Sequence, residues 1–223
     1  MLTIMPETPD KVSHRMMRYE WFGDEQKARL HEPHIAPITR LVDELRQQGR
    51  GWVPYVAPMH GGVSSRLLTV LRDPGPGTLD GSGSGMLCVE NDDPAAENQA
   101  NMMDAAGIHP SDLLPWNAYP WYINRHPRAS EIKAGLEPLF GILDMLPDLE
   151  VVLLQGGSAQ DSWRRAVIAR PDLLTRGLTV VSSFHPARQA LFHRDPEVRE
   201  ARRADRIEKM RLVGELLAMR THA

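Results

Sequence analysis

The sequence predicts an α/β protein, a three-layer α/β/α sandwich in which helices cover both faces of a central four-stranded parallel sheet. Short apolar segments alternate along the chain with longer segments in which apolar residues recur at helical spacing. Strands that alternate with helices at this chain length form parallel βαβ units. The 223 residues also suffice to bury one such sheet on both faces.

Apolar segments that end in polar, loop-forming residues are expected to form the sheet. One of them contains Pro115, which indicates an edge or irregular position, because proline has no N–H to donate to a neighbouring strand. Residues 52–59 also look extended. The expected strands are 66–71, 113–117, 150–155 and 178–182.

Amphipathic segments between these strands are expected to form the outer layers. Asp93 and Pro94 begin one helix, since proline suits the first helical turn, and Gly107 ends it. A short helix is also expected within residues 14–30. The remaining helices are expected at 38–49, 130–143, 159–169 and 195–219.

The chain is expected to form one domain with an N-terminal extension. Residues 1–32 carry many charges and little periodicity, which predicts a partly ordered arm. Residues 33–223 contain neither an internal repeat nor a second hydrophobic core, so we count them as a single domain. The Gly- and Ser-rich segment 78–85 falls inside this domain, which favours a mobile functional loop over a linker.

The composition narrows the classes of function. Apolar residues make up 42% and charged residues 25% of the chain, as in ordinary globular proteins. The single cysteine, Cys88, excludes a disulfide framework and any cluster built from several cysteines of one chain. With neither a signal sequence nor an apolar stretch of roughly 20 residues, we expect a cytoplasmic protein that contacts no membrane. The net charge of −3 argues against a nucleic-acid coat protein, but it leaves room for a local cationic groove.

Polar residues follow all four predicted strands at the point where each strand ends. Because the carboxyl ends of parallel strands lie at one edge of a sheet, these residues are expected to converge on a common site. Taken singly, each would also suit an ordinary surface turn or helix start. The residues are Asp73, Asn117, the turn Gly157-Ser158 and His185.

Together these motifs resemble the uracil-DNA glycosylase superfamily in order and spacing over residues 50–193. Prolines restrict the backbone of the loop after Asp73, and its glycines allow a ligand to approach the backbone closely. This loop resembles one signature motif of that superfamily. The His185-Pro186 pair resembles the other. The motifs that carry the resemblance are Asp73-Pro74-Gly75-Pro76-Gly77, Gly85-Met86-Leu87-Cys88, Asn117-Ala118, Leu153-Leu154-Gln155-Gly156-Gly157-Ser158-Ala159-Gln160 and His185-Pro186.

The resemblance implies a DNA repair enzyme that flips a damaged base out of the helix and hydrolyses its N-glycosidic bond. It implies that Asp73 orients the attacking water, that His185 stabilises the departing uracil, and that Asn117 reads the edge of the base. Arg188 would grip the DNA backbone or fill the space left by the extruded base. The residues implied to hold DNA are Gly157, Ser158, Ser183, Arg188 and Gln189.

The chain departs from the best-known members of the superfamily around the base. Gly75 stands where they have a tyrosine that excludes thymine, so discrimination against a 5-methyl group is expected to be poorer or to come from another side chain. Cys88 or Val89 stands where they stack an aromatic ring on the base, and Gln189 stands near their leucine wedge. A nearby aromatic cluster either supplies the missing stacking surface or packs on a neighbouring helix: Trp116, Tyr119, Trp121 and Tyr122.

Three functions remain as hypotheses. The first is a monofunctional, monomeric DNA glycosylase of base excision repair, which acts on uracil or a related deaminated base without a cofactor or metal. It would belong to a divergent branch that lacks the iron–sulfur cysteines. The second is a catalytically weak or inactive protein of the same fold that binds DNA or a damaged base. The third is a small-molecule hydrolase or phosphate-binding enzyme that uses Asp73 and His185, although no Gly-x-Ser-x-Gly elbow, P-loop lysine or GxGxxG motif accompanies them.

Overall fold

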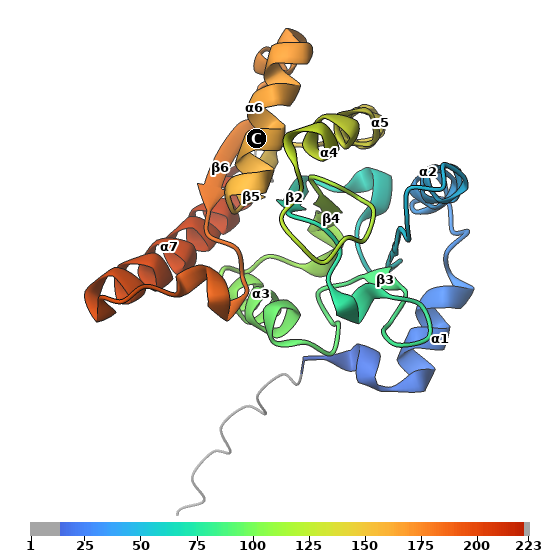
Figure 1. The fold of residues 1–223 in the computed structure, drawn as a ribbon, viewed down its shortest axis with the longest axis horizontal. Coiled ribbons are helices and arrows are strands. Elements are labelled where there is room, and N and C mark those ends of the chain that lie inside the picture. The colour runs from blue at the N-terminus through green and yellow to red at the C-terminus, as the bar shows by residue number, and fades with distance from the viewer. Residues whose placement is uncertain (1–13, 221–223) are drawn as a thin grey trace, which may run out of the picture.

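The computed structural model describes residues 14–220, and its central sheet confirms the predicted sandwich (Figure 1). Four parallel strands pair in the order β4-β2-β5-β6, which places β2 and β5 in the middle. Pro115 lies in the edge strand β4, as its missing N–H predicted. The strands are β2 (Leu67–Leu71), β4 (Leu113–Asn117), β5 (Val151–Gln155) and β6 (Thr179–Ser183).

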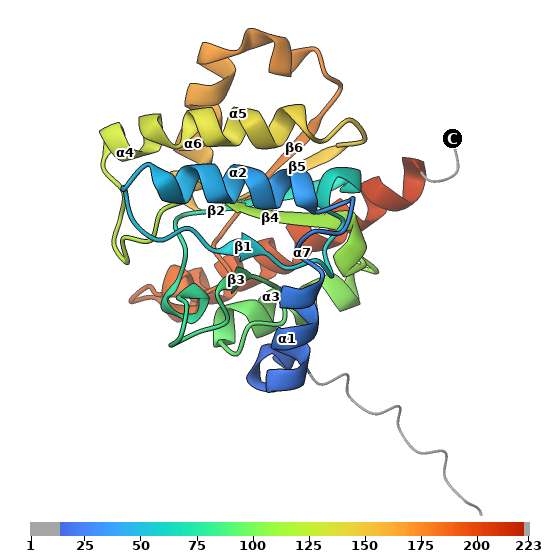
Figure 2. The same ribbon diagram turned by 90° about the vertical axis from the view of Figure 1, so that its right-hand side faces the viewer.

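One group of helices covers the upper face of the sheet in Figure 2. Successive residues of a strand point to opposite faces, so Leu68 and Val70 of β2 and Leu154 of β5 pack into the core on this side. The helices contribute side chains such as Val42 and Leu139 to the same core. These helices are α2 (Ala36–Gln47), α4 (Ala129–Ala134), α5 (Leu136–Asp144) and α6 (Gly157–Ala169).

A second pair of helices, α3 (Pro94–Ala105) and α7 (Pro196–Arg220), covers the opposite face (Figure 2). Leu67 of β2 points to this side and packs with Met103 of α3 and Val213 of α7. The sheet is therefore buried between two apolar cores, as its nearly continuous apolar strands require.

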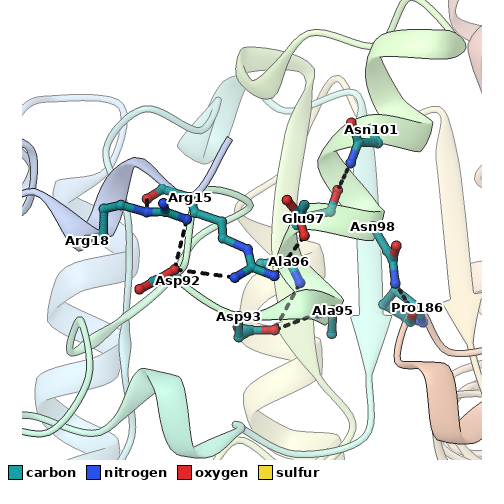
Figure 3. A network of polar contacts seen from close by, with 10 residues as sticks. All are labelled: Arg15, Arg18, Asp92, Asp93, Ala95, Ala96, Glu97, Asn98, Asn101 and Pro186. Atoms are coloured by element: carbon teal, nitrogen blue, oxygen red, sulfur yellow. Dashed lines mark hydrogen bonds and ion pairs between the residues drawn. The ribbon is translucent and has the colours of Figure 1, made fainter. Parts of the chain in front are cut away.

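The segment before the sheet is anchored to the start of α3. It contains η1 (Met16–Arg18) and α1 (Glu20–Ala28), within the range where a short helix was expected. Nη2 of Arg15 lies 2.7 Å from an oxygen of Glu97 in α3, and Nη2 of Arg18 lies 3.2 Å from an oxygen of Asp92. Figure 3 shows both contacts. Of the expected arm, residues 1–13 lie outside the described residues.

Two short strands form a second parallel sheet that the sequence did not predict. β1 (Tyr55–Val56) lies in the segment that was expected to be extended, and it pairs with β3 (Met86–Leu87). Each strand is 2 residues long, too short for an alternating pattern to distinguish it from a loop.

The helix expected over 130–143 is two helices, α4 and α5, which meet at Gly135. Pro138 has no N–H, so it cannot bond to the carbonyl of Ala134, and a continuous helix is interrupted. Gly135 also lies so close to the carbonyl oxygen of Ala118 that a Cβ there would stand 2.0 Å from it. The prediction was right in location and wrong in continuity.

Short 3₁₀ turns join the main elements. Besides η1, these turns are η2 (Gly62–Ser64), η3 (Pro76–Thr78), η4 (Pro110–Asp112), η5 (Pro171–Leu174) and η6 (Arg188–Leu191).

No helix within residues 14–220 is both long and apolar enough to cross a bilayer. The same range holds no group of at least three His, Cys, Asp or Glu side chains that are placed to bind a metal ion.

Candidate active site

The four strand ends that the sequence analysis singled out lie level along the carboxyl edge of the sheet. Asn117 of β4 stands opposite Leu71 of β2, and Ser183 of β6 stands opposite Gln155 of β5. The pairing of β2 with β5 continues the same register, so the last residues of all four strands lie side by side. The polar groups that follow the strands therefore leave the sheet on one side, as expected for parallel strands.

Asp73 is held inside the loop that follows β2. Its side chain has no exposed area, and its Oδ1 accepts a hydrogen bond from Nε of Arg72. Its Oδ2 is buried and has no hydrogen-bond partner in the part of the chain that the structure describes. The N–H of Ala118 donates to the Leu71 carbonyl over 2.8 Å and the N–H of Tyr119 donates to the Arg72 carbonyl over 3.1 Å, which fixes the loop. A carboxylate with an unused oxygen can accept a hydrogen bond from water or a ligand.

Asn117 ends β4 beside this loop, and its amide has spare donor capacity. The residue is only 3% exposed, and its Nδ2 donates to no group among residues 14–220. Leaving a buried donor unsatisfied costs about 1–3 kcal/mol, so the absence of a protein partner marks a position where a ligand or water can complete the bonding.

The turn after β5 supports the loop that carries His185. Gly156 has a φ of +98°, a conformation that favours glycine, and its N–H donates to the Ser183 carbonyl over 2.8 Å. A Cβ at Gly156 would lie 3.5 Å from the Cβ of His185, so His185 packs directly on this turn. Gly157 then begins α6, with Ser158 in its first turn.

The imidazole of His185 has one engaged nitrogen and one free nitrogen. The N–H of Ala187 donates to Nδ1 over 3.1 Å, which assigns the proton of the neutral ring to Nε2. No described residue accepts a hydrogen bond from this Nε2–H. Burial, with the positive charges of Arg72 and Arg206 nearby, lowers the pKa of His185 to about 4. Near pH 7 the ring is therefore a neutral donor.

The acid and the imidazole lie on either side of the end of β5. The strands that precede them, β2 and β6, are separated by β5 alone, and two strand spacings amount to about 10 Å. Arg72 pairs with Asp73 and also acts electrostatically on His185. The charge of Arg72 therefore influences both Asp73 and His185, which form no hydrogen bond with each other.

Two surface cavities of the protein lie away from Asp73 and His185. One encloses about 820 Å³ between α3, η6 and α7, and Arg188 is among its lining residues. The other encloses about 540 Å³ at the opposite, amino edge of the sheet, where His60 is among its lining residues. Neither cavity is lined by Asp73 or His185. Neither of these two cavities is therefore the expected pocket for a flipped base.

The other base-binding candidates have different surroundings. Gly75 is exposed, and open space surrounds the position of a Cβ there. Cys88 lies in a small core with its Sγ 3.3 Å from Sδ of Met59, and burial raises the pKa of its thiol to about 12. Val89 belongs to the core on the α3 and α7 side of the sheet. Neither Cys88 nor Val89 presents a surface on which a base could stack.

Three members of the aromatic cluster at the end of β4 belong to the interior, and the fourth, Tyr122, is partly buried. Trp116 and Trp121 are each 1% exposed, and Tyr119 is 5% exposed. Nε1 of Trp121 donates to the Leu45 carbonyl of α2 over 3.1 Å. Of the two interpretations of this cluster, the structure therefore supports packing against a neighbouring helix.

The DNA-binding candidates divide into buried and exposed groups. Ser183 is buried, and its carbonyl supports the turn at Gly156. Gly157 and Ser158 lie at the start of α6, where helical N–H groups are unpaired. Arg188 and Gln189 are exposed on η6 and line the larger cavity.

Two residues that hold the His185 loop were not predicted from the sequence. Nη1 of Arg206 donates to the carbonyls of Pro186 over 2.7 Å and of His185 over 3.3 Å. Nδ2 of Asn98 donates to the same Pro186 carbonyl over 3.3 Å (Figure 3). Arg206 and Asn98 come from two helices distant in sequence, so no local pattern marks them, whereas Arg72 could have been noticed as the neighbour of Asp73.

Comparisons with known proteins add no relative to this picture. No protein-family model matches the chain, and no curated protein matches it. A proposal for the function therefore rests on the geometry of the site and on the resemblance of its motifs.

Proposed function

We propose that the protein is a DNA glycosylase that hydrolyses the N-glycosidic bond of uracil, or of a related deaminated base, flipped out of DNA. The observation that carries this proposal is a set of unused hydrogen-bonding groups at one edge of the sheet: Asp73 Oδ2, Asn117 Nδ2 and the Nε2–H of His185. One acceptor and two donors match a water molecule and a base with two carbonyl oxygens. The resemblance of the motifs supports the same reaction.

Asp73 would act on the water and on the sugar. The reaction breaks the bond between N1 of the base and C1′ of the sugar, and the electron pair of that bond leaves with the base. Oδ2 of Asp73 would orient water toward C1′, while the carboxylate charge stabilises the positive sugar. As water adds to C1′, Asp73 takes up its proton, and solvent protonates the released base.

His185 would act on the leaving base. Its Nε2–H would donate to O2 of uracil as negative charge grows on that oxygen, in the manner of an oxyanion hole. With a pKa of about 4 the ring stays neutral, so it supplies a hydrogen bond rather than a full charge.

Asn117 and the start of α6 would provide recognition. The amide of Asn117 can donate to O4 and accept from N3–H of uracil, whereas cytosine presents the opposite pattern. The N–H groups at Gly157 and Ser158 would hold a DNA phosphate, as helix N-termini do. The partner would be DNA, and the proposed reaction suits the cytoplasmic location expected from the sequence.

Product analysis with oligonucleotides that carry uracil, hypoxanthine, xanthine or a thymine mispair tests this proposal. The wild-type protein should release free uracil, and Asp73→Asn should slow release by about 10²–10⁴-fold, because an amide cannot take a proton from water. DNA binding should remain. Asp80→Asn, which changes an exposed acid in the following loop, is the matched control. No base released by the wild type, or equal rates for wild type and Asp73→Asn, would overturn the proposal.

A base-binding protein without catalysis is the second candidate, and the pairing of Asp73 with Arg72 favours it. The guanidinium occupies Oδ1 and the Asp73 side chain has no exposed area, so water does not reach the carboxylate in the described conformation. Such a protein would retain uracil-containing oligonucleotides without releasing base. The same product analysis, run beside a binding assay, separates the two candidates.

A further inference from the structure

The larger cavity, next to the His185 loop, is lined by four arginines, and no acidic residue within 14–220 is among its lining residues. It encloses about 820 Å³ between α3, η6 and α7. Arg199, Arg203 and Arg206 line it from one side of α7, because residues three and four apart on a helix share a face. Arg188 adds a guanidinium from η6.

Arg206 is the most enclosed of these cations. It is 7% exposed, and its buried Nε has no hydrogen-bond partner among the described residues. Its Nη1 donates to the carbonyl oxygens of His185 and Pro186, and no carboxylate among residues 14–220 forms an ion pair with its guanidinium. Burial and the nearby Arg203 lower the pKa of Arg206. An anion in the cavity would stabilise this charge.

The neighbouring arginines are also available to a ligand. Nη1 of Arg199 donates to the carbonyls of His193 over 2.7 Å and of Arg194 over 3.2 Å, and no carboxylate in the described part of the chain forms an ion pair with it. Arg203 lies 2.7 Å from Glu200, but their side chains are 56% and 67% exposed, and exposed pairs of this kind hold each other weakly. The cavity therefore carries surplus positive charge.

An aromatic ring completes the wall. Phe192 lines the cavity and is 74% exposed, whereas the adjacent Leu191, which also lines it, is buried. Exposed aromatic rings stack on nucleic-acid bases, and guanidinium groups match the oxygens of phosphate. A volume of about 820 Å³ also lies within the range of small-molecule sites. A phosphate attached to a planar base fits this combination.

We propose that this arginine cavity binds one unpaired nucleotide of the DNA, with its base on Phe192 and its phosphate among Arg199, Arg203 and Arg206. The proposal rests on the proposed function and deepens it, because it adds a second nucleotide site to the one at the sheet edge. Residues 185–192 run from the candidate active site directly into the cavity wall, so one DNA strand can reach both. A free mononucleotide has the same chemistry, and the test separates the two sources.

Fluorescence anisotropy with the full chain tests the site. The probes are a uracil-free oligothymidine of about ten nucleotides, the corresponding duplex, thymidine monophosphate and inorganic phosphate. Phe192→Ala should weaken binding of the single strand about tenfold. Arg203→Gln should reduce the slope of log affinity against log salt by about 0.7, because one phosphate contact is lost. Both side chains are mostly exposed, so both variants should fold.

Matched controls lie on α7 outside the cavity. Ile207 is an exposed apolar side chain, and Arg211 is an exposed arginine paired with Glu215. Ile207→Ala and Arg211→Gln should bind the oligothymidine as the wild type does.

Three results would overturn the cavity proposal: unchanged oligothymidine binding by both cavity variants, equal affinity for thymidine monophosphate and the oligothymidine, or tighter binding of the duplex. The cavity proposal and the glycosylase proposal fail separately. If the wild type releases no base while the cavity variants weaken single-strand binding, only the glycosylase proposal is lost. If base is released while the cavity variants bind normally, only the cavity proposal is lost.

Discussion

Two histidines, the fully buried His60 and the partly buried His185, lie at opposite edges of the sheet and differ in the hydrogen-bonding capacity that their rings leave unused. Burial lowers the pKa of both His60 and His185 to about 4, so both rings are neutral near pH 7. Nδ1 of His60 lies 3.2 Å from the Pro110 carbonyl, and its Nε2 accepts from the N–H of Val89 over 3.4 Å. His185 engages only Nδ1 and keeps the Nε2–H free of described partners.

The comparison shows that burial and a lowered pKa do not by themselves distinguish a reactive histidine from a structural one. Lining one of the two cavities described above does not mark a reactive histidine either, because His60 lines one of them and His185 lines neither. What differs is the remaining hydrogen-bond capacity of the ring. His60 joins two backbone segments, whereas His185 can still donate to a bound molecule.

Replacing each histidine by phenylalanine sharpens this contrast most strongly. His185→Phe should slow uracil release by about 10²–10³-fold, because it removes the donor to the leaving base. His60→Phe should keep the catalytic rate at temperatures where it is folded, but it should lose about 1–3 kcal/mol of stability, because two buried backbone groups lose their partner. Single-turnover release assays and thermal melts check the pair. Similar rate losses in both variants would break the distinction.

The stability of the wild type should depend on pH through the same rings. Both folded-state pKa values lie below the ordinary value of 6.5, so the unfolded chain binds more protons between pH 6.5 and 4. Stability should therefore fall as the pH drops through this window, by about 3 kcal/mol for each histidine. Urea unfolding at successive pH values measures the slope. His60→Gln should flatten it, and an unchanged slope would mean that His60 is not buried as a neutral ring.

A smaller effect is expected at Asn117, which the account assigns to base reading. Asn117→Asp removes the donor to O4, so the preference for uracil over cytosine should fall by about tenfold. Release of both bases from otherwise identical oligonucleotides measures the ratio. Asn101→Asp, at an exposed asparagine of α3, serves as the control. A ratio that stays at the wild-type value would place base reading on another residue.

Much of the fold was predictable because apolar periodicity and loop-forming residues report directly on strands and helices. The parallel sheet, its edge strand with Pro115, and the level strand ends at Asn117 and Ser183 follow from such patterns. The sheet of β1 and β3 was not predictable, since 2-residue strands carry no period. The break at Gly135 depends on Pro138 and on a tertiary contact with Ala118.

The candidate site was predictable only as a set of strand ends. The pairing of Arg72 with Asp73 and the grip of Arg206 on the Pro186 carbonyl are side-chain geometries, and the second joins residues 20 positions apart. The burial of Cys88 likewise depends on how a small core closes around its side chain. Such contacts arise from packing between elements, which spacing along the chain does not encode.

The central claim is that His185 offers a free Nε2–H to a base at the carboxyl edge of the sheet. Nitrogen-15 NMR of the imidazole groups, recorded while free uracil is added, tests it most directly. The account predicts that His185 is neutral with its proton on Nε2, and that this resonance shifts with added uracil while those of His60 stay in place. A proton on Nδ1 of His185, or a His185 spectrum that uracil leaves unchanged, would contradict the account.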